Sequence, residues 1–255
     1  SDYDFVLFRS RQKPVATPLI VDTIRQFTDP KNIRVTSGFV SAQIDGRKIE
    51  VFQKDLNLIA KEISLAQKGQ FRWSIRQLFP HGDLSTGIIS HLIHLELCWE
   101  KDEIVSNLKR QAEPYPALLM NALIKTFMSE ARITVIHANK IRKTADFQYL
   151  VALCSAFIYY ANIVIFAVNR MYPVLERGGA KLILGLPLRP DNYDRRISSI
   201  FKAACEWDRN LVFSELSAIV QELETLTQNV LTDPSHGKPV SIERGLHLAA
   251  QQIDA

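Results

Sequence analysis

Short hydrophobic runs and alternating patterns near the start of the chain predict a small β-sheet. The run Phe5-Val6-Leu7-Phe8 predicts a strand over residues 4–8, and β-forming residues predict strands over 34–43 and 48–53. Asp45-Gly46, a frequent two-residue hairpin turn, separates the last two. Between the first two strands, an amphipathic helix is predicted over 18–27. Its apolar face would consist of Leu19, Ile20, Ile24 and Phe27.

Longer helical patterns dominate the rest of the chain. Apolar residues at helical spacing predict helices over 55–67 and 84–97, the second with Asp83 as its N-cap. Two prolines in Glu113-Pro114-Tyr115-Pro116 then break the pattern. Further helices are predicted over 117–141, 146–171, 194–204 and 211–231, with a short one over 241–253. Long helices joined by short loops indicate an antiparallel bundle. The predicted fold class is therefore α+β, with an α/β domain over 1–112 and an all-α domain over 113–255.

Composition agrees with a soluble enzyme that handles an anionic substrate. Of 255 residues, 47% are hydrophobic and 23% are charged, and the net charge is +4. These values allow real cores and suit a phosphate-bearing ligand. Cys98, Cys154 and Cys205 form neither a metal-binding spacing nor a disulfide framework. This cysteine usage favours a reducing, cytoplasmic compartment.

The most apolar stretch, over 150–168, is long enough to be checked as a membrane span. Ser155 and Asn162 interrupt it, and Tyr159-Tyr160 lie in its middle. A buried central helix is therefore predicted. The first residues also lack the basic and then apolar pattern of a signal peptide.

Three acidic residues lie on or beside the predicted strands. Asp2 and Asp4 alternate, so their side chains point to the same face, and Glu50 lies between Ile49 and Val51. Paired carboxylates suit a divalent cation that bridges to phosphates, and a buried glutamate needs a partner. The alternatives are a solvated acidic terminus for the aspartates and a solvent-facing edge position for Glu50.

Ser1-Asp2-Tyr3-Asp4 and Ile49-Glu50-Val51 resemble motifs of the polymerase-beta type nucleotidyltransferase superfamily. The similarity is greatest to its antibiotic-modifying branch, the aminoglycoside and lincosamide nucleotidyltransferases, and to uncharacterised relatives. Members carry a Gly-Ser pair at a helix start, then S-D-x-D on a strand and a third carboxylate on a neighbouring strand. The chain begins at Ser1, so the Gly-Ser element is absent and the domain is expected to be incomplete at its start. The third acid is Glu here and is often Asp in the family.

Later segments are also similar to this family. The segment from Leu97-Cys98-Trp99-Glu100 to Tyr115-Pro116 resembles its crossing from the catalytic to the helical domain. Ala167-Val168-Asn169-Arg170-Met171-Tyr172 resembles a helix of its substrate domain. The resemblance therefore covers most of the chain and implies a polymerase-beta-like domain followed by a helical substrate-binding domain.

The resemblance implies transfer of a nucleoside monophosphate from ATP or another nucleoside triphosphate to a hydroxyl of a small molecule, such as an aminoglycoside-like antibiotic. Asp2, Asp4 and Glu50 are then the catalytic and metal-binding residues and hold one or two Mg²⁺ ions. Glu50 completes the second metal site or takes the acceptor's proton. The nucleotide and the acceptor are the expected partners, whereas a membrane and nucleic acid are not. A homodimer is compatible with the resemblance, since some members of the family build their active site across a dimer.

Basic or hydroxyl side chains are expected beside the triphosphate. Ser1 in the matched motif and Lys181 after a glycine pair are the candidates for nucleotide contacts. Arg9, Arg47 and Lys48 are close in sequence to the acids.

Two other functions stay open. A non-catalytic relative would keep the fold and bind a nucleotide or a partner chain. Arg132 and His137 fit the R-x4-H spacing of helical ribonuclease domains of the toxin–antitoxin type, although residues five apart lie about 140° apart around a helix. His91 and His94 lie one helical turn apart, but no third metal ligand is near them in the sequence.

Overall fold

Four strands form a mixed sheet in the computed structural model, which describes residues 3–9, 17–36, 39–76, 79–141, 146–174 and 179–233. They are β1 (Tyr3–Arg9), β2 (Ile33–Val35), β3 (Phe39–Ile44) and β4 (Arg47–Asp55), in the order β1-β4-β3-β2. β1 runs parallel to β4, and the other two pairs are antiparallel. Asp45 and Gly46 have φ angles of 49° and 73°, as a type I′ turn requires. The predicted hairpin is therefore confirmed.

The single strand predicted over 34–43 is wrong, because this segment contains two antiparallel strands, β2 and β3. Thr36 stabilises the chain reversal between these two strands. Its N–H and its hydroxyl each donate to the carbonyl oxygen of Phe39, both at 3.0 Å. A continuous β-forming sequence gives no sign of such a reversal unless the turn residues are considered separately.

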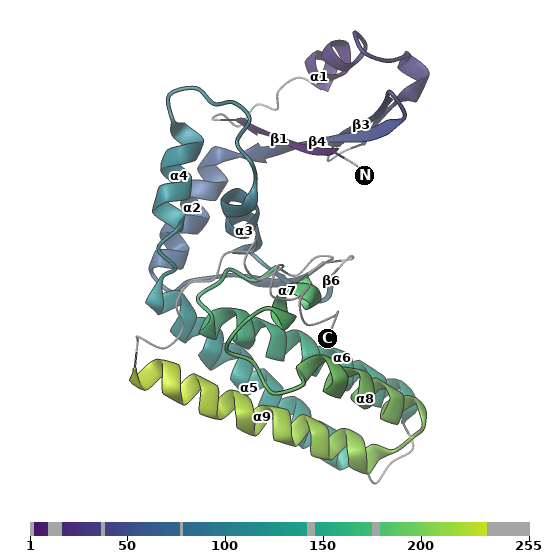
Figure 1. Ribbon diagram of the computed structural model, residues 1–255, viewed down its shortest axis with the longest axis vertical. Coiled ribbons are helices and arrows are strands. Elements are labelled where there is room, and N and C mark those ends of the chain that lie inside the picture. The colour runs from purple at the N-terminus through teal and green to yellow at the C-terminus, as the bar shows by residue number, and fades with distance from the viewer. Residues whose placement is uncertain are drawn as a thin grey trace. The chain divides into compact units, whose positions relative to one another are not determined.

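Helix α1 (Thr17–Ile24) covers part of one face of this sheet (Figure 1). Ile20 and Ile24 are buried there against the sheet, in a cluster with Val40, Ala42 and Val51. The predicted helical face is only half correct, because Leu19 and Phe27 are 61% and 64% exposed. The helix ends at Ile24, so Phe27 lies in the following turn rather than on the helix. A one-turn 3₁₀ helix (Pro30–Asn32) leads into β2.

Contacts divide the chain into two compact units, which we describe separately. The first unit comprises Ser1–Ile63 and Leu97–Gln111, and the second comprises Ser64–Glu96 and Ala112–Ala255. Helix α2 (Leu56–Gln67) continues from one to the other, and α4 (Ile104–Ala112) closes the first. The prediction of a catalytic domain over 1–112 and a substrate domain over 113–255 concerns function and stays a prediction.

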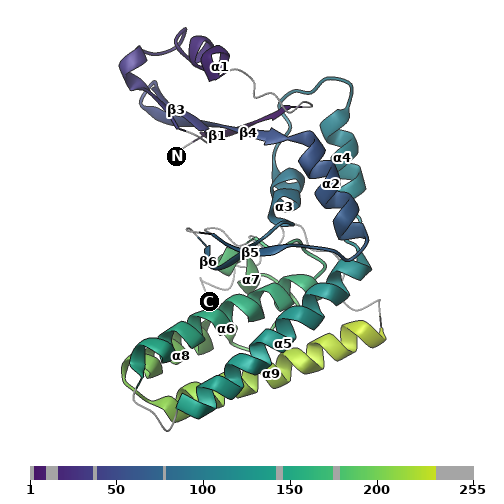
Figure 2. The same cartoon turned by 180° about the vertical axis from the view of Figure 1, so that it is seen from behind.

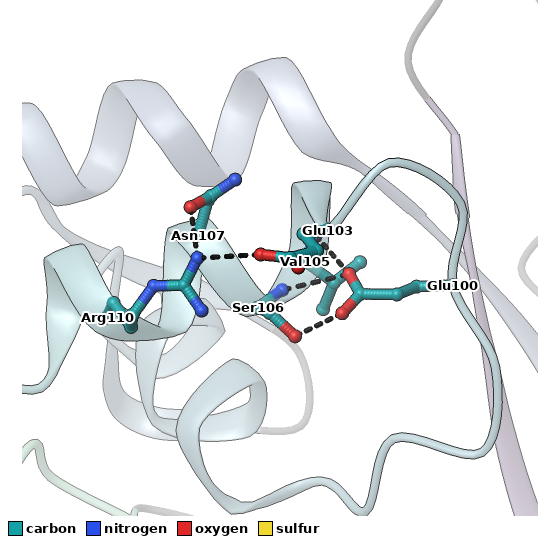
Figure 3. A network of polar contacts seen from close by, with 6 residues as sticks. All are labelled: Glu100, Glu103, Val105, Ser106, Asn107 and Arg110. Carbon is teal, nitrogen blue, oxygen red and sulfur yellow. Dashed lines mark hydrogen bonds and ion pairs between the residues drawn. The ribbon is translucent and has the colours of Figure 1, made fainter.

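Glu100 caps the N-terminus of α4 (Figure 3). Its Oε2 accepts hydrogen bonds from the backbone N–H groups of Val105 and Ser106, at 2.9 and 3.0 Å, and its Oε1 accepts one from the Ser106 hydroxyl. These bonds satisfy donors that a helix start leaves without intrahelical partners. Hydrogen bonding by Ser106 lowers the pKa of Glu100, since it favours the charged carboxylate.

Glu100→Gln is expected to loosen α4 at neutral pH. Because the folded pKa is lowered, the stabilisation by the carboxylate is present above the ordinary glutamate pKa of about 4.3 and is lost as the pH falls through the folded value. Hydrogen–deuterium exchange of the α4 peptide should be faster in the variant at pH 7, and the difference should vanish under acidic conditions. Glu103→Gln is the control, since the Glu103 carboxylate contacts Arg110 in an exposed pair. Equal exchange of wild type and Glu100→Gln at pH 7 would contradict the capping role.

The described part of the second unit is mainly helical and includes a hairpin (Figure 2). The hairpin consists of β5 (Trp73–Arg76) and β6 (Phe79–Leu84), and α3 (Gly87–His94) follows it. The helix predicted over 84–97 with Asp83 as its cap is therefore wrong at its start, because Leu84 ends a strand and Thr86 is the N-cap residue. The later helices are α5 (Ala117–Ile141), α6 (Phe147–Val168), α7 (Gly179–Leu184), α8 (Tyr193–Cys205) and α9 (Arg209–Thr232).

Helices α5, α6, α8 and α9 pack together and confirm the predicted helical bundle (Figures 1 and 2). Among the described residues, α6 is the one helix long and apolar enough to span a membrane, by length and composition alone. It contacts α5, α8 and α9 within the unit, and its last six residues, from Ile163 to Val168, are fully buried or nearly so. The helix predicted over 241–253 lies outside the described residues.

Candidate functional site

The sheet of the first unit brings Asp4 and Glu50 side by side. The two residues are register partners on the parallel strands β1 and β4, so their side chains leave the same face. Neighbouring strands are about 4.8 Å apart. Asp4 is exposed, and the Glu50 side chain is 17% exposed. The structure therefore joins two of the three predicted acids from segments more than forty residues apart.

A continuous row of polar residues crosses all four strands at this level. Ser41 pairs with Glu50 across β3 and β4, and Arg34 pairs with Ser41 across β2 and β3. Register partners share a face, so Arg34, Ser41, Glu50 and Asp4 form one line, called here the polar row. It lies on the face opposite to that covered by α1, because Val40, Ala42 and Val51 alternate with its members. Ser41 and Arg34 were missed from the sequence.

Lys48 lies next to the polar row. It precedes Glu50 by two residues on β4 and so projects from the same face. Its Nζ is 2.6 Å from Glu50 Oε1, and its side chain is 42% exposed. Of the basic residues expected near the acids, Lys48 is therefore in direct contact with one of them.

Arg47 projects from the opposite face of β4. Its Nη1 donates to the Tyr3 hydroxyl at 2.8 Å, and its guanidinium lies 5.5 Å from the centre of the Tyr3 ring. Together with Phe5, Ile44, Asp45 and Ile49, these two residues line an open pocket of about 520 Å³. The pocket and the polar row are separated by the thickness of the sheet. Arg47 is therefore unsuited to the expected role beside the carboxylates.

The assignments of the remaining predicted site residues stay predictions. Ser1 and Asp2 lie outside the described residues. Lys181 is exposed on α7 in the second unit, and its assignment to the nucleotide stays a prediction. No three His, Cys, Asp or Glu side chains gather as metal ligands within the described part of the chain. The membership of Asp2 in the set of three acids therefore stays a prediction.

Arg132 and His137 have separate partners in the bundle. Arg132 Nε is 2.6 Å from Glu224 Oε1 on α9, whereas His137 Nδ1 is 2.9 Å from the Tyr149 hydroxyl on α6. The two side chains of the R-x4-H pattern thus contact different helices. These contacts favour a role in helix packing over a shared ribonuclease site.

A serine–histidine contact in the second unit was missed by sequence reasoning. His81 Nε2 lies 2.6 Å from Ser155 Oγ, joining β6 to α6. A second bond attaches the hairpin to α6, from Tyr159 Oη to the Gly82 oxygen, and a bond from Trp73 Nε1 to the His81 oxygen joins the two strands of the hairpin. Burial lowers the pKa of His81. The contact therefore helps to hold the hairpin against α6. No local spacing in the sequence predicts it, because the two residues are far apart in the chain.

Comparison with protein-family models and with curated proteins found no match to this chain.

Proposed function

We propose that the protein is a metal-dependent nucleotidyltransferase whose first unit has the polymerase-beta-type fold. The observation that carries the proposal is the pairing of Asp4 with Glu50 on adjacent parallel strands. Two carboxylates on one sheet face, with Lys48 beside them, are suited to a metal-bound triphosphate. The S-D-x-D motif and the glutamate of Ile49-Glu50-Val51 add the sequence resemblance.

The donor set of the polar row fits Mg²⁺. This ion prefers carboxylate oxygens and keeps several of its waters, and the exposed Asp4 leaves room for such a hydrated ion. Asp4 and Glu50, with Asp2, would hold it. When bound, the metal supplies positive charge against the phosphoryl oxygens of the substrate.

The chain's own residues would then align and deprotonate the reactants. A hydroxyl of the acceptor attacks the α-phosphorus of the nucleoside triphosphate, forming a P–O bond. The bond from that phosphorus to the bridging oxygen breaks, and pyrophosphate leaves with the electron pair. In its alternative role as base, Glu50 takes the hydroxyl proton. Holding these groups in line provides much of the rate enhancement.

Calorimetric titration of ATP, with and without Mg²⁺, tests the proposal directly. The wild type is expected to bind ATP only when Mg²⁺ is present. Asp4→Asn should weaken this binding about tenfold or more, equivalent to about 1.4 kcal/mol, because it removes one metal-binding charge. Asp2→Asn combined with Asp4→Asn should abolish it.

The matched control is Asp22→Asn, which removes an exposed carboxylate on α1 whose Oδ1 lies 3.1 Å from Arg25 Nη1. This variant should bind Mg²⁺–ATP like the wild type. Failure of the wild type to bind, or equal binding by Asp4→Asn, would contradict the proposed site.

A further inference from the structure

We propose that Lys48 and a divalent cation are alternative partners of Glu50, so that Lys48 couples metal binding to nucleotide binding. The inference rests on the proposed function and adds a regulatory contact to that site. It starts from one distance, the 2.6 Å between Lys48 Nζ and Glu50 Oε1. At this separation the ammonium group donates directly to the carboxylate oxygen that a metal would use.

Charge explains why Glu50 needs a cationic partner. Asp4 is its register partner on β1, and two carboxylates on adjacent strands repel each other. Glu50 is also less exposed than Lys48, with 17% against 42% of the side chain accessible, so water screens its charge only partly. Lys48 therefore offsets the repulsion within the polar row.

A metal at Glu50 would have to displace this ammonium group. Both cations would bind the same carboxylate, and their charges repel at short range. The lysine side chain is a point charge on a flexible four-carbon stem. Because Lys48 is on the carboxylate face and partly exposed, it can leave Glu50 without disturbing the backbone of β4.

A metal-bound phosphate gives the displaced lysine a new anion. Lys48 would exchange the Glu50 carboxylate for a phosphoryl oxygen of the nucleotide, a ligand that lysine commonly binds. Metal alone must break the ion pair with Glu50, whereas metal with nucleotide also supplies a phosphoryl oxygen to Lys48. The consequence is positive coupling, in which nucleotide tightens metal binding and metal tightens nucleotide binding by the same factor.

The test measures Mn²⁺ affinity by electron paramagnetic resonance, with and without α,β-methylene ATP, which does not react. In Lys48→Met, Mn²⁺ alone should bind about two- to fivefold more tightly, the range expected for loss of one competing ion pair. The tightening by nucleotide, expected to be on the order of tenfold in the wild type, should shrink by at least half.

Two variants control for charge and for folding. Lys48→Arg keeps a cation beside Glu50 and should retain most of the coupling. Lys31→Met breaks the exposed pair of Lys31 and Asp29, 3.2 Å apart in the same unit, and should leave both affinities unchanged. Matching circular dichroism melting curves show that each variant is folded.

The outcomes separate this inference from the proposed function. Unchanged Mn²⁺ affinity and unchanged coupling in Lys48→Met, with an Mn²⁺ site that still depends on Asp4, would overturn the role of Lys48 alone. A wild type without any Asp4-dependent Mn²⁺ site would overturn both. Tighter metal binding and weaker coupling, seen in Lys48→Met and absent in Lys48→Arg, would support the exchange.

Discussion

Asp4→Asn is expected to lower kcat/KM for nucleotidyl transfer by at least about 10³-fold, or about 4 kcal/mol of transition-state stabilisation. Asparagine keeps the size of the side chain and removes the charge that would hold the metal. The polar row would then have one carboxylate fewer to hold the cation that offsets the negative charge of the triphosphate. The assay is pyrophosphate release from ATP and Mg²⁺ with a panel of aminoglycosides and lincosamides.

Substitutions at Glu50 show whether the reaction depends on the carboxylate charge or on the length of the side chain. Glu50→Gln should lose activity on the same scale as Asp4→Asn, because the amide neither binds Mg²⁺ well nor accepts a proton. Glu50→Asp should retain more, since the resembling family often has Asp at this position. Asp22→Asn again serves as the control on α1.

Activity retained in both Asp4→Asn and Glu50→Gln would show that the polar row is not the reaction centre. A wild type that binds Mg²⁺–ATP through Asp4 but transfers to no acceptor would instead favour the second hypothesis, a nucleotide-binding relative without catalysis. The binding and transfer experiments are therefore informative together, because each removes a different alternative.

Local sequence could predict one half of the polar row. A two-residue turn at Asp45-Gly46 pairs Ile44 with Arg47, and counting outward from that pair places Ser41 opposite Glu50. The same alternation assigns Lys48 to the face of Glu50 and Arg47 to the other face. These relations follow from turn geometry and a side-chain period of two, so they needed only a firm hairpin prediction.

The pairing of Asp4 with Glu50 depends on a different kind of information. β1 and β4 are parallel and adjacent, although two other strands and α1 lie between them in the chain. Such a crossover is decided by packing of the whole sheet, with the apolar side chains of α1 covering β3. No spacing within either segment specifies it. The two acids could be identified as candidates from the sequence, whereas their proximity becomes apparent only in the fold.

The missed β5–β6 hairpin shows tertiary contacts overriding a helical pattern. Leu84 continues the apolar periodicity of α3, which is why a helix was predicted to start there. In the fold, Trp73 Nε1 donates to the His81 oxygen at 2.9 Å, and Tyr159 Oη donates to the Gly82 oxygen at 2.7 Å. Gly82 has a φ of 111°, and a β-carbon there would lie 1.8 Å from Trp73 Nε1. Only glycine fits this approach, a condition set by Trp73 on the partner strand β5.

Asn169→Ala is expected to lower the free energy of unfolding of the second unit by about 3 kcal/mol. Asn169 is fully buried at the C-terminal end of α6. Its Nδ2 donates to the carbonyl oxygens of Ile165 and Leu188, both at 2.7 Å, and its Oδ1 accepts from the Leu188 N–H at 3.1 Å. The amide thus joins α6 to the segment that precedes α8.

Alanine would remove the Asn169 side chain from the N–H and the carbonyl oxygen of Leu188, whereas the Ile165 oxygen keeps the backbone N–H of residue 169. Each buried polar group left unpaired costs about 1–3 kcal/mol. Asn169→Asp should also destabilise, because it keeps the acceptor for Leu188 but removes both donated bonds and introduces a buried charge. Asn121→Ala, at an exposed position on α5, is the control. It should be neutral or slightly stabilising, since alanine is the better helix former.

Urea unfolding followed by tryptophan fluorescence reports on the second unit through Trp73, which packs against Phe127 and Tyr160 there. Trp99 in the first unit is replaced by phenylalanine in all the proteins compared, so that it does not contribute to the signal. A lower midpoint with an unchanged slope would identify a loss of stability. The stretch around Asn169 resembles a substrate-domain helix of the nucleotidyltransferases, so a direct role in acceptor binding is the competing hypothesis. That role predicts the opposite pattern, an unchanged midpoint with a raised KM for the acceptor. Because the hydrogen bonds of Asn169 are satisfied by backbone atoms of its own unit, we expect the stability to fall.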